Sequence, residues 1–171
     1  GSEQQIAAAL AGRPGFDDPL GQIIGGTAFL CSARVSPGVI HHTEYGQIAL
    51  AEASGPPRGR TEAIAETFRR CDIPCKINPS LARIRWRKLL WNVPFNGLGA
   101  AGLGADSHTV IEDPILLAAA RGLMDEILAA ARADGIELDP AACETMIEST
   151  RAMGRYRSSM QLDWEAGRPM E

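Results

Sequence analysis

The chain has 171 residues, of which 45% are hydrophobic and 22% charged, and its formal net charge is −4. This length suits about one domain with a substantial hydrophobic core. The negative charge argues against a general nucleic-acid binder, and no apolar run approaches the roughly 18 residues of a membrane-spanning helix. We therefore expect neither nucleic acid nor a membrane as a partner.

The four cysteines indicate neither a disulfide framework nor a metal site. They are Cys31, Cys71, Cys75 and Cys143. Cys71 and Cys75 are spaced too widely for a redox C-x-x-C motif, and no histidine or second cysteine pair lies near them in sequence. We expect buried or partly buried thiols, no metal and, given a polar start without a secretory signal pattern, a cytoplasmic location.

The first half of the chain is predicted to combine short helices with strands. A helix over residues 4–10 ends at a Gly/Pro break, and another helix begins near Thr61. Between them we expect three strands whose tight connections make them antiparallel. These strands are residues 23–35, 39–45 and 47–52. A further short strand is predicted within residues 73–79.

The second half is predicted to be all-helical. The helices run from Leu81 to about Leu103, from Pro114 to Gly135, from Pro140 to about Met153, and from Ser158 toward Gly167. Ser80 and the Asp113-Pro114 pair are typical of helix starts, and Gly135 is typical of a helix end. Helices this rich in Ala, Leu and Ile pack on one another. The β-rich front is too thin for an independent domain, so we interpret it as the end of a larger sheet domain.

Residues 97–102 match the G-x-G-x-x-G pattern of dinucleotide-binding proteins. That pattern binds a pyrophosphate when a strand leads into the glycines and a helix follows them. Here a helical pattern precedes Gly97, and the sequence L-G-A-D-S-H-T-V at 103–110 does not read as the opening of a helix. We therefore interpret the glycines as small residues that allow close helix packing.

Lys88, Asn92 and Asn96 precede these glycines and are spaced by four, so they share one face of a helix. Asn is a poor residue for a helix interior, and Pro94 adds a kink in the same turn. Such breaks of local rules are enriched at functional sites. The alternative is a solvated face that continues the basic run at residues 83–88. The residues alone leave both interpretations open.

Two segments carry a resemblance to a known family. R-K-L-L-W-N-V-P-F-N at 87–96 is followed, farther along the chain, by S-S-M-Q-L-D-W-E-A-G-R-P-M-E at 158–171. The stretch G-G-T-A-F-L-C-S-A-R-V-S-P-G-V-I-H-H-T at 25–43 agrees as well. In this order they resemble ketopantoate reductase (2-dehydropantoate 2-reductase), across nearly the whole chain from about Gln4.

The resemblance implies an NADPH-dependent enzyme that reduces 2-dehydropantoate to pantoate on the route to pantothenate and coenzyme A. It implies a mainly α fold, with an all-helical substrate domain like the C-terminal domain of 6-phosphogluconate dehydrogenase after a small antiparallel β remnant of a Rossmann domain. Residues 1–78 would be the end of the nucleotide-binding domain, and residues 79–171 the helical domain. The family's glycine fingerprint would precede Gly1, so we expect this chain alone to bind no NADPH and to be inactive.

The resemblance also implies roles for individual residues. Lys88 matches the family's catalytic lysine, and Glu171 matches the acidic residue that anchors the substrate near it. The matched substrate-binding positions are Asn92, Asn96 and Ser159. The implied substrate is a small 2-keto acid. Met170 stands where the family often has Thr, so the polar contacts at this position differ from the family pattern. Many family members have unassigned substrates, and a 2-keto acid other than 2-dehydropantoate therefore stays open.

A competing hypothesis is a non-enzymatic helical interaction module whose binding surface is the basic run at 83–88. It predicts that Asn92, Asn96 and Ser159 face solvent separately, whereas the reductase hypothesis predicts that they converge with Lys88 on one cleft. We also expect self-association, for example as a homodimer, because a chain without its nucleotide domain would expose apolar strand edges and helix faces.

Overall fold

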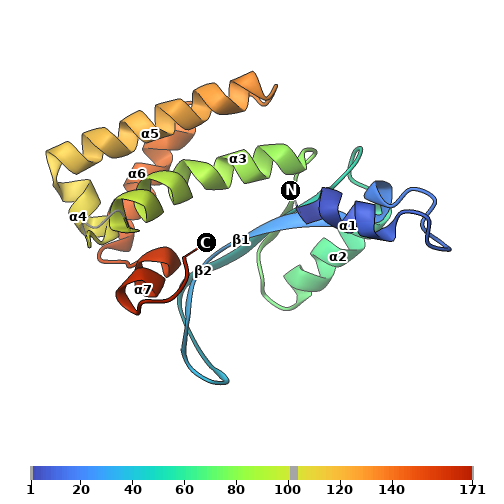
Figure 1. Ribbon diagram of the computed structural model, residues 1–171, viewed down its shortest axis with the longest axis horizontal. Helices are drawn as coiled ribbons and strands as arrows, with labels where there is room; N and C mark the ends of the chain where they lie inside the picture. The colour runs from blue at the N-terminus through green and yellow to red at the C-terminus, as the bar shows by residue number, and fades with distance from the viewer. Residues whose placement is uncertain (1, 101–103, 171) are drawn as a thin grey trace. The chain divides into compact units, whose positions relative to one another are not determined.

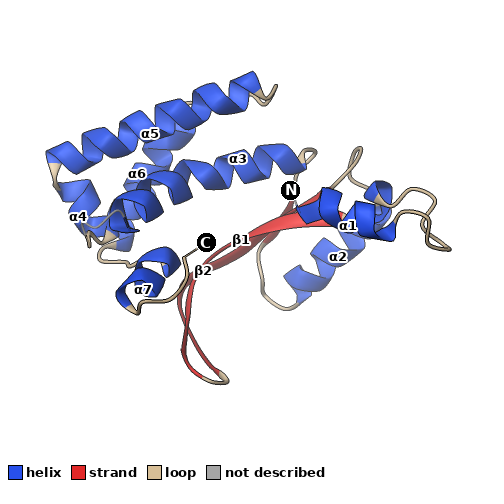
Figure 2. Ribbon diagram, in the orientation of Figure 1, coloured by secondary structure: helices blue, strands red, loops and turns tan. Residues whose placement is uncertain are grey.

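The structure, a computed structural model, describes residues 2–100 and 104–170 (Figure 1). This part is mainly helical with one small sheet, which confirms the predicted fold class (Figure 2). The helices are α1 (Ser2–Leu10), α2 (Gly59–Arg70), α3 (Leu81–Trp91), α4 (Ser107–Glu112), α5 (Pro114–Ala133), α6 (Ala141–Met153) and α7 (Ser159–Glu165). The strands are β1 (Ile24–Ser36), β2 (Val39–Glu52) and β3 (Cys75–Ile77). A 3₁₀ turn, η1 (Leu20–Gln22), and a π-helical turn, η2 (Asn92–Asn96), are also present.

The chain divides into two compact units, Gly1–Arg85 and Trp86–Glu171, and the boundary falls within α3. The first unit contains the sheet with α1 and α2, and the second contains the end of α3 with η2 and α4 to α7. The assignment of residues 1–78 to the end of a nucleotide-binding domain, and of residues 79–171 to a helical domain, stays a prediction.

The sheet has the strand order β1-β2-β3. β1 and β2 form the expected antiparallel hairpin, whereas the short β3 joins β2 in parallel. The prediction of separate strands at 39–45 and 47–52 is wrong, because both belong to β2. Phe29 pairs with Gln47 and Leu30 with Tyr45, which leaves Gly46 as the extra residue of a β-bulge. Its φ of 124° lies in a region that glycine reaches without strain, so the turn signal in the sequence is a bulge inside one strand.

One face of this sheet packs against α2. The buried core is formed by Leu50, Ala65 and Cys75, and it is flanked by the half-buried Ile24, Ile48, Phe68 and Ile77. At the end of β2 the buried Glu52 accepts hydrogen bonds from Arg60 Nε at 3.1 Å and from Thr61 Oγ1 at 2.5 Å. These bonds join β2 to the first turn of α2.

The first helix is held by an ion pair that involves the basic run of α3. Glu3 of α1 is 8% exposed and accepts a hydrogen bond from Arg85 Nη2. Arg85 is therefore engaged within the first unit, whereas its neighbours Arg83 and Arg87 are exposed. The basic run at 83–88 is not a uniform solvated surface.

The second unit is a helical cluster. α4 packs on α5 and α6, while η2 packs on α5 and α7. Its buried apolar side chains include Leu90, Phe95, Val110, Met124, Ile127 and Ile147. The helix α4 was not expected from the sequence. It begins at Ser107 because the Asp106 carboxylate accepts a hydrogen bond from Thr109 N at 2.8 Å, an N-cap contact.

Three of the predicted helix boundaries, at Ser80, Asp113 and Gly135, are confirmed at their caps. Ser80 Oγ accepts from Arg83 N at 3.2 Å, and Asp113 Oδ1 accepts from Ile115 N at 2.8 Å. Gly135 follows α5 with a φ of 76°, a conformation that favours glycine. The predicted end of the α3 segment near Leu103 lies outside the described residues.

The cysteines differ in their exposure. Cys31 and Cys75 are buried and Cys143 is half-buried, but Cys71 is exposed at the end of α2, so the burial prediction is wrong for Cys71. Burial raises the pKa of the Cys75 and Cys143 thiols. Within residues 2–100 and 104–170 there is no cluster of three or more His, Cys, Asp or Glu side chains that could hold a metal ion. No helix in these ranges is both long and apolar enough to cross a membrane.

Candidate active site

The row of Lys88, Asn92 and Asn96 lies where α3 changes into η2. Pro94 has no N–H to donate to the preceding turn, and the chain responds by widening into a π-helical turn. In an α-helix, residues four apart overshoot a full turn by about 40°. In a wider turn four residues fall short of a full turn, which offsets the overshoot of the preceding step and turns Asn96 back toward the direction of Lys88. Such widened turns occur frequently at functional sites.

Burial increases along this row. Lys88 and Asn92 are half-buried, and Asn96 is 9% exposed. The Oδ1 atom of Asn96 is buried and has no hydrogen-bond partner among the described residues. A buried polar atom without a partner costs about 1–3 kcal/mol, so native structures contain few of them. A ligand that donates a hydrogen bond to Asn96 would account for this atom.

Lys88 also differs from the comparable cations of the chain. Three of the described lysine and arginine residues are half-buried, namely Arg60, Arg85 and Lys88. Arg60 pairs with Glu52, and Arg85 pairs with Glu3. Lys88 pairs with no carboxylate in the part of the chain that the structure describes. A half-buried ammonium group that has no carboxylate partner among the described residues suits an anionic or electron-rich ligand.

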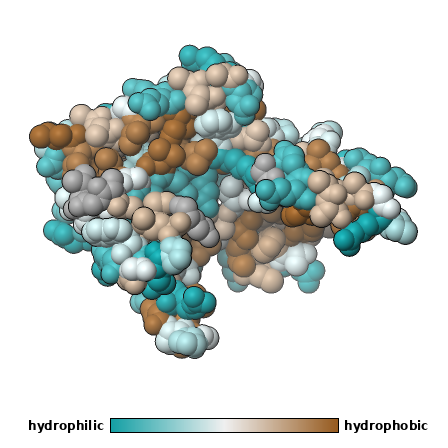
Figure 3. All heavy atoms as spheres, viewed as in Figure 1, coloured by the Kyte–Doolittle hydropathy of each residue, from teal (hydrophilic) through white to brown (hydrophobic). Residues whose placement is uncertain are grey.

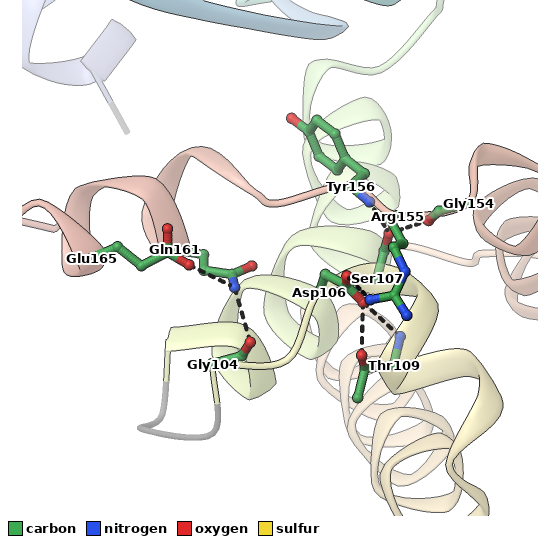
Figure 4. Close-up of polar contacts among 9 residues, drawn as sticks. All are labelled: Gly104, Asp106, Ser107, Thr109, Gly154, Arg155, Tyr156, Gln161 and Glu165. Carbon is green, nitrogen blue, oxygen red and sulfur yellow. Dashed lines mark hydrogen bonds and ion pairs between the residues drawn. The ribbon is translucent and has the colours of Figure 1, made fainter.

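The helix that carries Ser159 packs on η2. Its N-cap is the buried Ser158, whose Oγ accepts from Gln161 N at 3.2 Å, and Ser159 itself is exposed. Gln161 is 2% exposed and donates from Nε2 to Gly104 O at 3.2 Å and to Glu165 Oε1 at 3.1 Å (Figure 4). The bond to Gly104 ties α7 to the segment that follows η2.

A second group of polar contacts holds the segment that leads into α7 (Figure 4). Ser107 Oγ donates to Gly154 O at 2.8 Å and accepts from Tyr156 N at 3.0 Å. Arg155 pairs with Asp106 at 3.0 Å. Although burial acts to raise it, the pKa of Asp106 lies below its ordinary value because Thr109 and Arg155 hydrogen-bond the carboxylate. These contacts position α7, and sequence reasoning missed them. The D-x-x-T capping pattern at residues 106–109 is the feature of the sequence that could have indicated the role of Asp106.

The glycine motif does not form a phosphate cradle in the described residues. Gly97 and Gly99 continue the helical path after η2, no strand leads into them, and Gly102 lies outside the described residues. A Cβ atom on Gly99 would lie 3.1 Å from Ala105 O and 3.5 Å from Gln161 Oε1. Gly99 therefore serves a close approach of chain segments, and the glycines present do not fit a dinucleotide.

The expected site residues thus divide into three groups. Lys88, Asn92 and Asn96 lie on one helix, and α7 brings Ser159 to the neighbourhood of η2. Glu171 lies outside the described residues. Asn96 does not face solvent, which contradicts what the interaction-module hypothesis predicts for it.

Comparison with known proteins gives a match to a family model over the second half of the chain. The family model described as "Ketopantoate reductase PanE/ApbA C terminal" matches residues 80–171. A 2-dehydropantoate 2-reductase of Nostoc sp. is 36% identical over 176 residues, which cover 100% of this chain and 52% of that protein. The crystal structure of 2-dehydropantoate 2-reductase from Geobacter metallireducens GS-15 matches with a TM-score of 0.90 and 38% identity, covering 100% of this chain and 55% of that one.

More distant relatives agree in fold. A structure of D-mandelate dehydrogenase with NADH matches with a TM-score of 0.77 at 17% identity, a likeness of fold alone. The chain spans about half the length of the curated relatives that it matches, 52% for the Nostoc protein and 45% for a 2-dehydropantoate 2-reductase of Mesorhizobium japonicum that is 28% identical. On the match over residues 80–171, the chain belongs to the ketopantoate reductase family.

Proposed function

We propose that this chain supplies the catalytic cation and the substrate-binding residues of an NADPH-dependent 2-dehydropantoate 2-reductase, which forms pantoate on the route to pantothenate and coenzyme A. The observation that carries the proposal is the pairing, on one helix, of a half-buried Lys88 without a carboxylate partner among the described residues and a buried, unpartnered Asn96 Oδ1. The names of the relatives and their coverage of the whole chain support it.

Lys88 would act on the keto oxygen of the substrate. Reduction of a ketone develops negative charge on that oxygen, and an ammonium group that donates a hydrogen bond to it stabilises the transition state. The same Nζ carries the proton that the oxygen needs to become a hydroxyl. Glu171 would balance the charge of Lys88 and anchor the substrate beside it.

Asn92, Asn96 and Ser159 would orient the substrate. An unpartnered carbonyl oxygen such as Asn96 Oδ1 requires a hydrogen-bond donor. 2-Dehydropantoate carries a hydroxyl group besides its keto and carboxylate groups, whereas a simple keto acid offers acceptors only. The site therefore favours a hydroxylated 2-keto acid. A family member that reduces a different 2-keto acid is the alternative, and the exposed Met170 is the residue that keeps it open.

We assign NADPH binding to the half of the relatives that this chain does not match, because the described glycines do not fit a dinucleotide. The chain alone should therefore neither bind NADPH nor catalyse reduction. Calorimetric titration of this chain with NADPH tests the assignment, and micromolar binding would refute it.

A homodimer is part of the same proposal. Apolar side chains reach the surface of the helical unit, and Figure 3 shows apolar atoms gathered on its visible face. The exposed apolar residues of this unit include Ile115, Leu89, Val93 and Trp164. Light scattering of the whole protein measures the oligomeric state, and a monomer at micromolar concentration would contradict this part.

The main experiment replaces Lys88 by Ala in the full-length protein and follows NADPH oxidation with 2-dehydropantoate. We expect kcat/KM to fall about 10²- to 10³-fold, as for loss of other groups that stabilise a developing oxyanion. Arg87→Ala is the matched control, because Arg87 is adjacent and exposed, and it should leave kcat/KM within about twofold. An unchanged rate for Lys88→Ala would remove the assignment.

A further inference from the structure

Trp91 lies at the junction of α3 and η2, between Lys88 and Asn92 in sequence, and is 8% exposed. Its ring stacks on Phe95, with centroids 5.2 Å apart and an interplanar angle of 23°. Tyr156 contacts the same ring at a centroid distance of 6.0 Å. The indole therefore lies on the buried side of the helix.

A hydrogen bond joins this indole to a different helix. Trp91 Nε1 donates to Thr150 Oγ1 of α6 at 3.0 Å, and Thr150 Oγ1 donates to Met146 O at 2.7 Å. Thr150 is 1% exposed. The hydroxyl group therefore donates its proton within its own helix and accepts the Trp91 N–H with a lone pair. The two bonds together fix the hydroxyl group in one orientation.

A hydrogen bond between the site helix and α6 resists rotation of the site helix about its axis. A widened turn that contains Pro94 has fewer internal hydrogen bonds than an α-helix, so contacts outside the turn must hold its direction. The indole bond provides such a contact at the residue next to Asn92. A small rotation there would swing Lys88 and both asparagines together, because all three share the helix.

We propose that Thr150 is a positioning residue that acts through Trp91 to fix the direction in which Lys88, Asn92 and Asn96 point. The inference rests on the proposed function, since it concerns the same row of residues. It adds a buried residue of α6 that lies outside the motifs found in the sequence.

The test compares variants of the full-length protein in the NADPH-dependent reduction of 2-dehydropantoate. Thr150→Val keeps the shape but leaves the indole N–H without an acceptor, and Thr150→Ser keeps the hydroxyl group. We expect Thr150→Val to lower kcat about tenfold or more, since small misplacements of catalytic groups have large effects on rate. Thr150→Ser should restore kcat to within about threefold of the original value, because both hydrogen bonds can re-form.

A matched control separates positioning from stability. Ile147→Val removes a methylene group from a fully buried residue of the same helix and leaves the indole bond in place. It should lower the melting temperature while kcat stays within about twofold, because a small core truncation destabilises without moving the site. If Thr150→Val proves too unstable to assay, Trp91→Phe removes the same bond from the other side and should lower kcat in the same way.

The outcomes are distinguishable from failure of the proposed function. Retained kcat in Thr150→Val and Trp91→Phe, together with lost activity in Lys88→Ala, would overturn the inference and leave the function standing. An equal loss of kcat in Ile147→Val would also overturn it, since the effect would then follow stability alone. Retained activity in Lys88→Ala would remove the proposed function and the inference with it.

Discussion

Two buried polar side chains, one in each unit, differ in whether the described residues give them hydrogen-bond partners. Glu52 in the first unit is 3% exposed and accepts hydrogen bonds from both Arg60 and Thr61. Asn96 in the second unit is 9% exposed, and its Oδ1 atom has no partner among the described residues. Both groups lose hydration on folding, but of the two, only Glu52 regains its hydrogen bonds from the described residues.

Under the proposed function, the difference is that between a structural polar group and one that binds a ligand. Arg60 also donates to Gly21 O at 2.7 Å, so the Glu52 cluster joins β2, α2 and the turn η1. The hydrogen bond from Arg60 holds the pKa of Glu52 below its ordinary value. Among the described residues Asn96 Oδ1 has no such partner, so its burial lowers the stability of the second unit unless a group outside them, such as a ligand, bonds to it. We infer that Asn96 lowers the stability of the second unit because this position serves ligand recognition.

The largest effect on stability should follow from removing the cation beside Glu52. Arg60→Met leaves a buried carboxylate without its charged partner and should lower the free energy of unfolding by about 2–3 kcal/mol. This is less than the roughly 3–5 kcal/mol lost when a fully buried pair is broken, because Arg60 is partly exposed. Urea unfolding measures the loss. Arg70→Met, at an exposed position of the same helix, is the control and should change little. Equal losses in both variants would show that the Glu52 cluster is not structural.

The opposite sign is expected in the second unit. Asn96→Leu removes the unpartnered oxygen and fills a similar volume, so the free energy of unfolding should rise by up to about 1 kcal/mol. In the full-length protein the same change should raise KM for the substrate. A loss of more than about 1 kcal/mol would show that Asn96 has a structural role.

The contribution of the Glu52 cluster to stability should also depend on pH. The folded-state pKa of Glu52 lies below its ordinary value of 4.5, so its contribution to stability is complete above pH 4.5 and is lost as the pH falls through the lowered folded value. Glu52→Gln should therefore be less stable than the original chain at neutral pH, and the gap should narrow in acid. The urea unfolding midpoints of both proteins between about pH 7 and pH 3 measure this difference in stability. A difference that stays constant with pH would contradict a lowered pKa of Glu52 in the folded chain.

The smallest effect is expected where charges face water. Arg121 of α5 donates to both carboxylate oxygens of Glu144 on α6, at 2.6 and 3.0 Å, but both residues are exposed. Solvent screens such a pair, so Arg121→Ala should lower the melting temperature far less than Arg60→Met does. A loss as large as that of Arg60→Met would show that exposure does not decide the strength of these pairs.

The sequence predicted what depends on local chemistry. The caps at Ser80, Asp113 and Ser158 and the stop at Gly135 involve neighbours a few residues away, and all are found in the structure. Gly46 was misinterpreted, because whether a glycine forms a turn or a bulge depends on pairing with β1.

The site was predictable only in part, for a related reason. The row of Lys88, Asn92 and Asn96 is visible in the four-residue spacing and in the family resemblance. The π-helical turn that aligns it, the bond of Trp91 to Thr150 and the missing partner of Asn96 Oδ1 depend on packing between distant segments. No local pattern encodes such contacts, and a spacing rule for regular helices cannot anticipate a widened turn.

The most direct test of the central claim is a crystal structure of the full-length protein with pantoate bound. If the open polar atoms form the substrate site, Lys88 Nζ donates to an oxygen on C2 of the ligand, and a ligand hydroxyl group donates to Asn96 Oδ1 within hydrogen-bond distance. A ligand bound elsewhere, with Asn96 Oδ1 still unpartnered and Lys88 directed into solvent, would contradict the account.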